Sequence, residues 1–315
     1  MDVSIIMPVY NVGVFLDEAI ESLLNQSTDV KYEIIIINDA STDNTSSVLK
    51  KYNDSKIKIL NNKNNLGPGA SRNKGIEKAR GNYLMFVDGD DYVSPNFVDV
   101  MYNQISKNKA DICICNIIRL EDSKETIWHL GDKGIYKEGD YSKVLLMKFH
   151  SCNKIFRRGL LEKNLYPGNM FFEDVVAVGK AILDAKKIVK IDDALYYYRR
   201  RKSSITNDLS PSNFDILKAL ESIENKFLEA NYKEEIEYLY INDILNDLII
   251  KIFWSGDHNV ISKVDELLSK VNKKYPKWHK NKILKKQRLV KRLYFYFLRK
   301  KYYSFVKSII MRIGD

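Results

Sequence analysis

The chain has 315 residues, of which 45% are hydrophobic and 29% charged, and its net charge is +10. This length and composition allow one full α/β domain with a smaller appendage, and they exclude a disordered chain. No apolar run is long enough to span a bilayer, and the short apolar segment after Met1 lacks the basic start of a secretion signal. The cysteines form no CxxC pair and indicate buried, reduced thiols, so we expect a cytoplasmic protein.

The first 120 residues predict alternating strands and helices. Apolar runs indicate buried strands at 3–7, 33–37, 57–60, 83–87 and 111–118, with the first strand stopped by Pro8. Helical spacing is expected over 15–24 and 70–79. Ser41 or Thr42 is expected to cap a second helix, and Ser94 and Pro95 to open another. This order is typical of βαβ units around a parallel sheet, so we expect an α/β, Rossmann-like domain.

The rest of the chain predicts a helix over 173–185, a short strand at 187–191 and a separate edge strand at 195–198. From residue 213 onward only helical periodicity remains. We therefore expect a catalytic domain over 1–210, in halves 1–120 and 121–210, and a helical extension over 211–315. The boundary is placed near Leu209-Ser210-Pro211.

Polar residues follow four successive strands, at the edge where open α/β sheets bind ligands. The first strand ends in Pro8-Val9-Tyr10-Asn11 and the second in Asn38-Asp39. Asn65-Leu66-Gly67 follows the third strand, and Asp88-Gly89-Asp90-Asp91 the fourth. These strand ends are expected to present aromatic, amide and carboxylate groups together.

Asp88 and Asp90 flank a glycine that lets the backbone bend, and two such carboxylates can hold a hard divalent cation. The ion, Mn²⁺ or Mg²⁺, would keep positions open for substrate phosphates. The alternative interpretation of the same residues is a solvated acidic turn.

Residues 3–91 resemble the nucleotide-binding half of family 2 glycosyltransferases, which have the GT-A fold. Four motifs match in order, Pro-Val-Tyr-Asn, Asn-Asp-Ala-Ser-Thr-Asp, Asn-Leu-Gly followed by Ala70-Ser71-Arg72-Asn73, and Asp-Gly-Asp-Asp. The resemblance is strong to about residue 120, patchy to about residue 208, and then fades into a helical tail like that of bacterial capsule and exopolysaccharide transferases.

The resemblance implies a role for each matching residue. Pro8, Tyr10 and Asn11 would line the base and ribose pocket, and Asp39 would accept a hydrogen bond from the uracil N3–H. Asn65 and Arg72 would lie near the base and diphosphate. Asp88 would contact ribose or metal, and Asp90 would be a metal ligand. The alternative interpretations are a helix N-terminal cap for Asp39 and a surface helix residue for Arg72.

The pair Glu173-Asp174 begins a predicted helix after a bulky apolar run. In the family that these residues resemble, the second acid of such a pair is the catalytic base, so Asp174 is expected to take a proton from the acceptor hydroxyl, with Glu173 in support. In-line attack would then invert the anomeric configuration. The alternative is that both acids only favour the helix N-terminus.

Two weaker matches complete the site. The segment 152–156, with Asn153 and Lys154, resembles a family segment that lines the sugar and acceptor site. The basic run 198–205, with Arg199 and Arg201, resembles the stretch that closes over the diphosphate. It contains no histidine, so a third metal ligand from the protein is not expected there, and a solvated basic turn is the alternative.

Basic residues concentrate at the C-terminus. Residues 270–315 contain 16 Lys or Arg and one acid, whereas residues 1–269 contain 35 basic and 40 acidic residues. Leu289, Leu293, Tyr296 and Phe297 fall on one face of a predicted helix surrounded by this charge. The pattern predicts attachment to an anionic membrane surface. The alternative is a helix packed on the catalytic domain.

Together these observations predict an inverting, metal-dependent glycosyltransferase that moves a sugar from a UDP-sugar to a hydroxyl of a glycan or lipid-linked acceptor, in bacterial capsule or other surface polysaccharide synthesis. It would be peripheral on the inner face of the cell membrane, without a nucleic acid partner. A nucleotidyltransferase and a non-catalytic nucleotide-sugar-binding protein are the alternatives. The sequence leaves open whether the chain forms a homo-oligomer.

Overall fold

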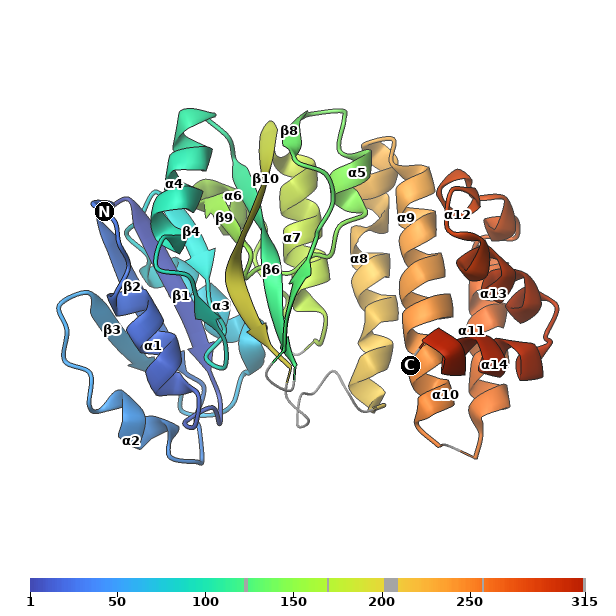
Figure 1. Cartoon of the computed structure of the whole chain (residues 1–315), viewed down its shortest axis with the longest axis horizontal. Helices are drawn as coiled ribbons and strands as arrows, with labels where there is room; N and C mark the ends of the chain where they lie inside the picture. The colour runs from blue at the N-terminus through green and yellow to red at the C-terminus, as the bar shows by residue number, and fades with distance from the viewer. Residues whose placement is uncertain (122–123, 169, 201–208, 257, 314–315) are drawn as a thin grey trace. The chain divides into compact units, whose positions relative to one another are not determined.

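The computed structural model describes residues 1–121, 124–168, 170–200, 209–256 and 258–313. The chain divides into two compact units, Met1–Arg201 and Lys202–Asp315, shown from blue to red in Figure 1. The division falls earlier than the predicted boundary at residue 210.

The first unit is built on a mixed sheet of ten described strands, in the order β3-β2-β1-β4-β9-β6-β10-β5, with β7 beside β6 and β8 beside β10. Strands β1, β2, β3 and β4 are mutually parallel where they pair, as βαβ units require. The strands are β1 (Val3–Val9), β2 (Tyr32–Asn38), β3 (Ile57–Asn61), β4 (Tyr83–Phe86), β5 (Tyr92–Val93), β6 (Ile112–Glu121), β7 (Lys124–Trp128), β8 (Gly134–Lys137), β9 (Lys154–Arg157) and β10 (Lys187–Arg199).

Helices cover both faces of this sheet, which is why β1 and β2 are buried along their whole length. One face packs against α1 (Leu16–Leu24), α2 (Thr45–Leu49) and α4 (Phe97–Lys107). The other side carries α3 (Gly67–Lys78), α6 (Arg158–Lys163) and α7 (Glu173–Asp184) (Figure 1). A short helix, α5 (Ser142–Leu145), precedes β9.

The prediction that Pro8 stops the first strand is wrong. Strand β1 continues to Val9, with Pro8 opposite Ile37 of β2. The pairing of β1 with β4 ends at Ile6. Because every second residue of a strand turns its backbone amide to the same neighbour, the next residue of β1 that would face β4 is Pro8. The missing N–H of Pro8 therefore leaves no partner of β4 unsatisfied.

The two strands predicted at 187–191 and 195–198 are one strand, β10. It runs parallel to β6 with register shifts between Lys190 and Ala194 and between Ala194 and Tyr196. The exposed pair Asp192-Asp193 lies in this bulge, so polar residues interrupt the apolar pattern without ending the strand. The C-terminal half of β10 is not an edge of the sheet, because β5 pairs with it at Tyr196 and Tyr197.

Helix starts also differ slightly from expectation. Helix α2 begins at Thr45 without a side-chain cap from Ser41 or Thr42, and α4 begins at Phe97, two residues after Pro95. Such differences are within the usual range for helix ends.

The described residues of the second unit, 209–256 and 258–313, are helical and contain no strand, which confirms the predicted helical extension. None of these helices is both long and apolar enough to cross a membrane. They are η1 (Pro211–Phe214), α8 (Asp215–Glu229), α9 (Lys233–Leu239), η2 (Tyr240–Leu248), α10 (Ile249–Trp254), α11 (Val260–Lys274), η3 (Trp278–Lys280), α12 (Lys282–Lys285), α13 (Leu289–Arg299) and α14 (Tyr303–Ile313).

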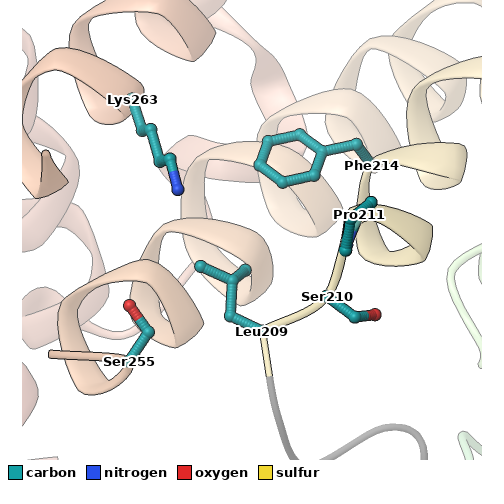
Figure 2. A pocket seen from close by; sticks show the side chains of 6 residues that line it. All are labelled: Leu209, Ser210, Pro211, Phe214, Ser255 and Lys263. Carbon is teal, nitrogen blue, oxygen red and sulfur yellow. The ribbon is translucent and has the colours of Figure 1, made fainter. Parts of the chain in front are cut away.

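A cavity of about 580 Å³ lies within this second unit (Figure 2). It is lined by Leu209, Ser210, Pro211, Phe214, Ser255 and Lys263. None of these residues belongs to the site predicted from the sequence.

Candidate active site

Asn11 braces the first two strand-end loops against each other. Its Oδ1 accepts hydrogen bonds from the backbone N–H groups of Thr42 (2.8 Å) and Asp43 (3.3 Å). Asn11 and Ala40 both adopt positive φ angles, 51° and 57°, a costly conformation that clusters at functional sites. Tyr10 is exposed beside this brace, whereas Pro8 is buried inside β1. Of the three residues predicted to line the base pocket, only Tyr10 and Asn11 therefore present side chains at this edge.

Asp39 holds the loop after β3 at the start of α3. Its buried carboxylate accepts from the backbone N–H groups of Leu66 (2.9 Å) and Gly67 (2.8 Å) and from Asn62 Nδ2 (2.7 Å). The helix-cap interpretation is thus realised, although for α3 rather than for the helix that follows Asp39. Asn65 is exposed and its Oδ1 accepts from the N–H of Gly67 (3.1 Å). The polar loop and Asp39 meet as predicted.

The Ser-Arg-Asn segment of α3 contacts other parts of the first unit through all three of its side chains. Ser71 accepts from Asn62 Nδ2 (3.1 Å). Asn73 donates to the carbonyl of Tyr166 (2.7 Å) and accepts from its N–H (2.9 Å), as a backbone strand would. Arg72 lies between them and is only 5% exposed, so its interpretation as a surface residue is wrong.

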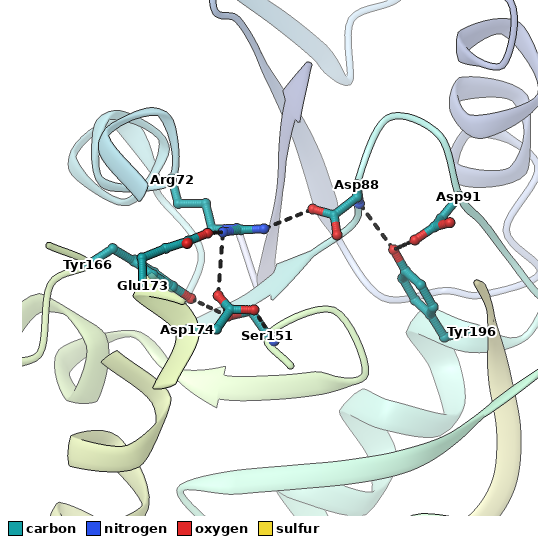
Figure 3. A network of polar contacts seen from close by, with 8 residues as sticks. All are labelled: Arg72, Asp88, Asp91, Ser151, Tyr166, Glu173, Asp174 and Tyr196. Carbon is teal, nitrogen blue, oxygen red and sulfur yellow. Dashed lines mark hydrogen bonds and ion pairs between the residues drawn. The ribbon is translucent and has the colours of Figure 1, made fainter. Parts of the chain in front are cut away.

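Arg72 contacts both groups of acids predicted from the sequence, Asp88 in the loop after β4 and the pair Glu173-Asp174 at the start of α7 (Figure 3). Its guanidinium donates to Asp88 (2.9 Å) and to Glu173 (2.5 Å), and lies 3.4 Å from Asp174. Burial alone would lower the pKa of Arg72, but the three carboxylates outweigh it and hold this pKa above its usual range. One cation thus holds carboxylates that are far apart in the sequence.

Asp174 is the more accessible acid of its pair. Its side chain is 24% exposed, against 10% for Glu173. Ser151 fixes it by donating from its N–H (3.2 Å) and its Oγ (2.8 Å), and Tyr166 Oη lies 2.7 Å from that Oγ. Burial and the neighbouring Asp174 raise the pKa of Glu173, and the ion pair with Arg72 opposes them. This geometry favours Asp174 as the acid that meets a substrate.

The start of α7 is tightly built around these acids. Phe172, which precedes it, has a positive φ of 63°, an unusual conformation for a bulky residue. Gly69 of α3 packs beneath Glu173, and a Cβ there would come within 2.7 Å of the Pro167 carbonyl and 3.2 Å of Glu173 Cγ. The pair of acids is therefore held by both helices.

Asp91, which the sequence analysis left without a role, anchors the acidic loop to β10. Its buried carboxylate accepts from Tyr196 Oη (2.7 Å) and from the N–H of Arg199 (2.8 Å), and Tyr196 Oη accepts from the N–H of Asp88 (3.1 Å) (Figure 3). Burial, and then the charges of Asp90 and Asp88, raise the pKa of Asp91. The loop is thus fixed to the sheet by Asp91, which leaves the carboxylate of Asp88 partly exposed at the surface.

Gly89 is required by close approach rather than by a bend. Its φ is not in the left-handed region, but a Cβ at this position would lie 2.7 Å from Val9 Cγ1 and 3.0 Å from Val12 Cγ2. Only glycine lets the acidic loop lie against the end of β1.

Asp88 and Asp90 are the residues predicted to bind a metal. The described part of the chain contains no group of three or more His, Cys, Asp or Glu that could hold an ion. Two carboxylates with only oxygen donors nevertheless suit Mg²⁺ or Mn²⁺, which is commonly held by one or two carboxylates together with substrate phosphates and water. Asp88 and Asp90 lie on the same short loop, and their two negative charges would suit such an ion.

Arg199 contacts the acidic loop but is engaged by other groups. Its Nε donates to the carbonyl of Asp90 (3.0 Å) and its Nη2 to Glu18 (2.6 Å), and the guanidinium lies over the ring of Phe15 (5.1 Å). Arg201, predicted with it to contact the diphosphate, lies outside the described residues.

Asn153 and Lys154 lie beneath the site rather than on its surface. They are 0% and 1% exposed. Asn153 donates to the carbonyl of Cys115 (2.7 Å), and Lys154 Nζ donates to the carbonyl of His150 (2.6 Å) and to Asn153 Oδ1 (2.9 Å). Burial lowers the pKa of Lys154 to about 8. The sequence predicts that these side chains line the sugar or acceptor site. Both are instead buried and hydrogen-bonded to the backbone near the turn that carries Ser151.

Three residues of the site escaped the sequence analysis, namely Ser151, Tyr166 and Tyr196. Each acts on a residue far away in the chain, and none stands in a motif of its own. The only local signal was Asp91, the third acid of Asp-Gly-Asp-Asp, which needs a buried partner if it is not solvated.

Comparison with known proteins assigns the chain to a family. The model of "Glycosyl transferase family 2" matches residues 4–165, about half of the chain. Glycosyltransferase GlyG of Streptococcus pneumoniae is 30% identical over 237 residues, which cover 70% of this chain and 77% of GlyG.

Two solved structures share the fold. A crystal structure of Staphylococcus aureus TarS 1–349 in complex with UDP-GlcNAc has a TM-score of 0.77 at 20% identity, covering 100% of this chain and 93% of that one. The mannosyltransferase PcManGT from Pyrobaculum calidifontis, in complex with GDP-Man and Mn²⁺, has a TM-score of 0.53 at 13% identity, covering 98% of this chain and 84% of that one. The predicted GT-A fold with a helical extension is confirmed, and the chain belongs to glycosyl transferase family 2.

Proposed function

We propose that this protein transfers a sugar from a UDP-sugar to an acceptor hydroxyl with inversion at the anomeric carbon. The observation that carries the proposal is Arg72, which fixes Asp88 at the donor edge of the sheet and Asp174 at the start of α7 within one network (Figure 3). The anomeric carbon of a donor bound at Asp88 and Asp90 would lie between the diphosphate and Asp174.

Asp174 would act as the general base. Its carboxylate would take the proton of the acceptor hydroxyl as that oxygen forms a bond to the anomeric carbon. The bond from this carbon to the diphosphate oxygen breaks at the same time, and UDP leaves with the electron pair. Ser151 would hold Asp174 in place for attack from the side opposite UDP, so an α-linked donor would give a β-linked product.

Asp90, with Asp88, would hold Mn²⁺ or Mg²⁺. A bound ion would act as a Lewis acid that neutralises the diphosphate leaving group. The Mn²⁺ in the complex of the fold neighbour PcManGT supports this assignment. The oxygen-only donor set of the loop supports it independently.

The choice of uridine depends on the edge formed by Tyr10, Asn11 and Asp39. Tyr10 offers an exposed ring against which a base could stack. The described hydrogen bonds of Asp39 leave acceptor capacity on a carboxylate, which has about four lone-pair positions. The UDP-GlcNAc bound by the fold neighbour TarS also supports a uridine donor.

Donor binding can be tested without knowledge of the acceptor. Thermal unfolding would be measured with UDP-, GDP- and dTDP-linked sugars, each with and without Mn²⁺. A ligand at 100 times its Kd stabilises the folded state by about 2.7 kcal/mol. We expect UDP-sugars with Mn²⁺ to raise the melting temperature most, and an equal response to all three nucleotides would contradict the uridine assignment.

Asp90→Asn should weaken UDP-sugar binding and nearly abolish transfer while the fold survives. One metal ligand loses its charge in this variant, whereas the anchors of the loop through Asp91 stay intact. Calorimetric titration of UDP-sugar with Mn²⁺ measures the loss, and Asp193→Asn, an exposed aspartate of the β10 bulge, is the matched control. Full wild-type activity after exhaustive EDTA treatment would disprove the metal assignment.

We also propose that the C-terminal helices attach the protein to an anionic membrane surface, where a lipid-linked acceptor would be reached from the cytoplasm. Helix α13 has two apolar faces. One packs within its own unit, where Tyr294 Oη donates to the Leu245 carbonyl (2.7 Å) and Leu298 is buried. The other carries Leu289, Leu293 and Tyr296, which are 65%, 41% and 52% exposed. Three residues of the stripe predicted from the sequence are thus exposed, whereas the fourth, Phe297, is half-buried and stacks on Phe305 (ring centroids 5.0 Å apart).

The charge around this exposed face supports an anionic partner. Residues 282–314 contain no acid. Exposed cations that make no ion pair within the described residues surround the face, namely Lys285, Lys286, Arg288, Arg292, Arg299 and Lys300. Each cation near an anionic bilayer contributes about 1 kcal/mol, and the apolar side chains would add burial. Exposed Tyr302, in the turn after α13, and exposed Phe305, on the neighbouring helix α14, add further apolar side chains.

The full chain should co-sediment with phosphatidylglycerol vesicles, less as salt rises, and not with phosphatidylcholine vesicles. Replacing Leu289, Leu293 and Tyr296 by serine should reduce binding at least tenfold, because the inserted apolar area is lost. Point substitutions are preferable to truncation, because α13 also contributes buried residues such as Phe295 to its unit.

The matched control replaces three exposed apolar residues elsewhere in the same unit, Leu228, Trp254 and Ile261, by serine. This variant should bind the vesicles like the wild type. Equal losses in both triple variants, or a full chain that ignores phosphatidylglycerol at low salt, would contradict the membrane proposal.

A further inference from the structure

Tyr166 has no part in the mechanism proposed above, although its hydroxyl lies in the network around the candidate base (Figure 3). The residue stands between α6 and α7, in a segment without regular secondary structure, and it is 2% exposed. A buried tyrosine usually finds a hydrogen-bond partner for its O–H, so the partner indicates what the residue can do. Here that partner is Ser151, whose Oγ lies 2.7 Å from the tyrosine Oη.

The direction of these hydrogen bonds follows from the number of protons. Ser151 Oγ carries one proton, which it donates to Asp174 Oδ1 over 2.8 Å. The same oxygen can still accept, so Tyr166 is the donor in its contact with Ser151. Burial, and then the charge of Asp174, raise the pKa of Tyr166, and the hydroxyl therefore keeps its proton. The three side chains form a chain of donors that ends on the candidate base.

Tyr166 is held in place by α3 and β4. Asn73 donates to its carbonyl (2.7 Å) and accepts from its N–H (2.9 Å), which fixes the backbone. The ring packs edge to face against Phe86, with centroids 5.6 Å apart, and the guanidinium carbon of Arg72 lies 5.5 Å from the ring centre. Because backbone and ring are both fixed, the tyrosine oxygen stays at a constant position. Helix α3 therefore supports the base through Tyr166 as well as through Arg72.

The contacts of Asp174 distinguish its two carboxylate oxygens. Oδ1 accepts from Ser151 Oγ and lies 3.4 Å from Arg72, whereas Oδ2 accepts the longer bond, 3.2 Å, from the Ser151 N–H. Hydrogen bonds in a chain polarise one another, so donation by Tyr166 strengthens the bond that Oδ1 accepts. Oδ1 is thereby fixed, and Oδ2 keeps more of its acceptor capacity for an incoming hydroxyl.

We propose that Tyr166 is a positioning residue for the general base. By donating to Ser151, it directs the single proton of the serine hydroxyl toward Asp174 and so fixes the carboxylate for proton transfer. In this role Tyr166 acts through Ser151 and not on the substrate. The inference rests on the proposed function, since it requires Asp174 to be the base. Loss of the tyrosine hydroxyl should therefore slow turnover without weakening donor binding.

Tyr166→Phe keeps the ring against Phe86 and removes only the hydroxyl. A UDP-release assay with Mn²⁺, on the UDP-sugar that the wild type uses fastest, should give a kcat about fivefold to tenfold below wild type, the effect of one hydrogen bond. KM should stay within about twofold. The matched control, Tyr141→Phe, removes a buried hydroxyl that donates to the Ala185 carbonyl (2.7 Å) at the other end of α7, and it should turn over like the wild type. Calorimetric titration with UDP counts the folded binding sites, so each kcat refers to folded protein.

A double-mutant cycle separates action through Ser151 from a general effect on packing. Ser151→Ala should lose at least as much kcat as Tyr166→Phe, and adding Tyr166→Phe to it should change kcat by less than about twofold. The inference is overturned if Tyr166→Phe has the kcat of the wild type, if its KM rises instead, or if the two losses multiply in the double variant. Near-normal turnover of Asp174→Asn in the same assay would instead contradict the proposed function itself.

Discussion

Asp174→Asn should retain UDP-sugar affinity within a few-fold and lose transfer by a factor of roughly 10² to 10⁴. A general base acts as the new bond forms, so its removal affects turnover much more than donor binding. Asparagine keeps the shape of the side chain and can still contact Ser151, which limits the change to proton transfer. Calorimetry with UDP-sugar and a UDP-release assay measure the two quantities.

The control for this variant is again Asp193→Asn, which removes the same charge at an exposed position of the same unit. It should leave turnover unchanged. Near-normal turnover of Asp174→Asn would show that another acid is the base, and Glu173→Gln would then be the next variant to assay. A large loss of donor affinity in Asp174→Asn would mean that this residue binds the donor instead.

Arg72→Met should remove both activity and stability. Without the guanidinium, Glu173 is left as a buried carboxylate without its ion pair, and Asp88 and Asp174 lose their common partner. Breaking a buried pair by removing one member typically costs about 3–5 kcal/mol. The free energy of unfolding, measured with urea, should fall by an amount of this order, and UDP release should become undetectable.

Two further variants test the physical reason. Lys78→Met lies in the same helix α3, but its side chain is 44% exposed, so its free energy of unfolding should change by less than about 1 kcal/mol. Adding Glu173→Gln to Arg72→Met should recover part of the lost stability, because a buried charge is removed, but no activity. If Arg72→Met is as stable as Lys78→Met, the network does not hold the site together.

Much of the fold could be predicted because the first four strands are local apolar runs, and β1, β2 and β4 lie in the interior of the sheet. β2 is buried along its whole length, so its isoleucines show no alternation and their meaning is clear from the sequence. The polar residues that follow these strands converge because parallel strands end at one edge. Asp39 and the loop at Leu66 and Gly67 are an example, since their contact depends only on this topology.

The links between the motifs could not be predicted, because they depend on contacts between distant residues. Nothing near Arg72 in the sequence indicates that it will be buried among carboxylates from two other segments. Asn153 and Lys154 stand in a motif, yet the structure buries both under the turn at Ser151. A motif identifies residues that matter, but it does not separate a residue that touches substrate from one that supports it.

The bulge in β10 and the tail illustrate a second limit. Asp192 and Asp193 break the apolar pattern in the same way as a true strand end, and only the register with β6 distinguishes the two. In α13 the sequence identifies an apolar face, but Tyr294 and Leu298 form a second one. Which face is covered depends on the packing of the other helices.

The central claim is a single in-line displacement at the anomeric carbon, and proton NMR of the sugar released from an α-linked UDP-sugar tests it most directly. Water can replace the acceptor, so the anomeric form of the freed sugar can be observed before it equilibrates. We predict that the β-anomer appears first, in equal amount with UDP. First appearance of the α-anomer, or release of UMP and sugar phosphate as a nucleotidyltransferase-type cleavage would give, would contradict the account.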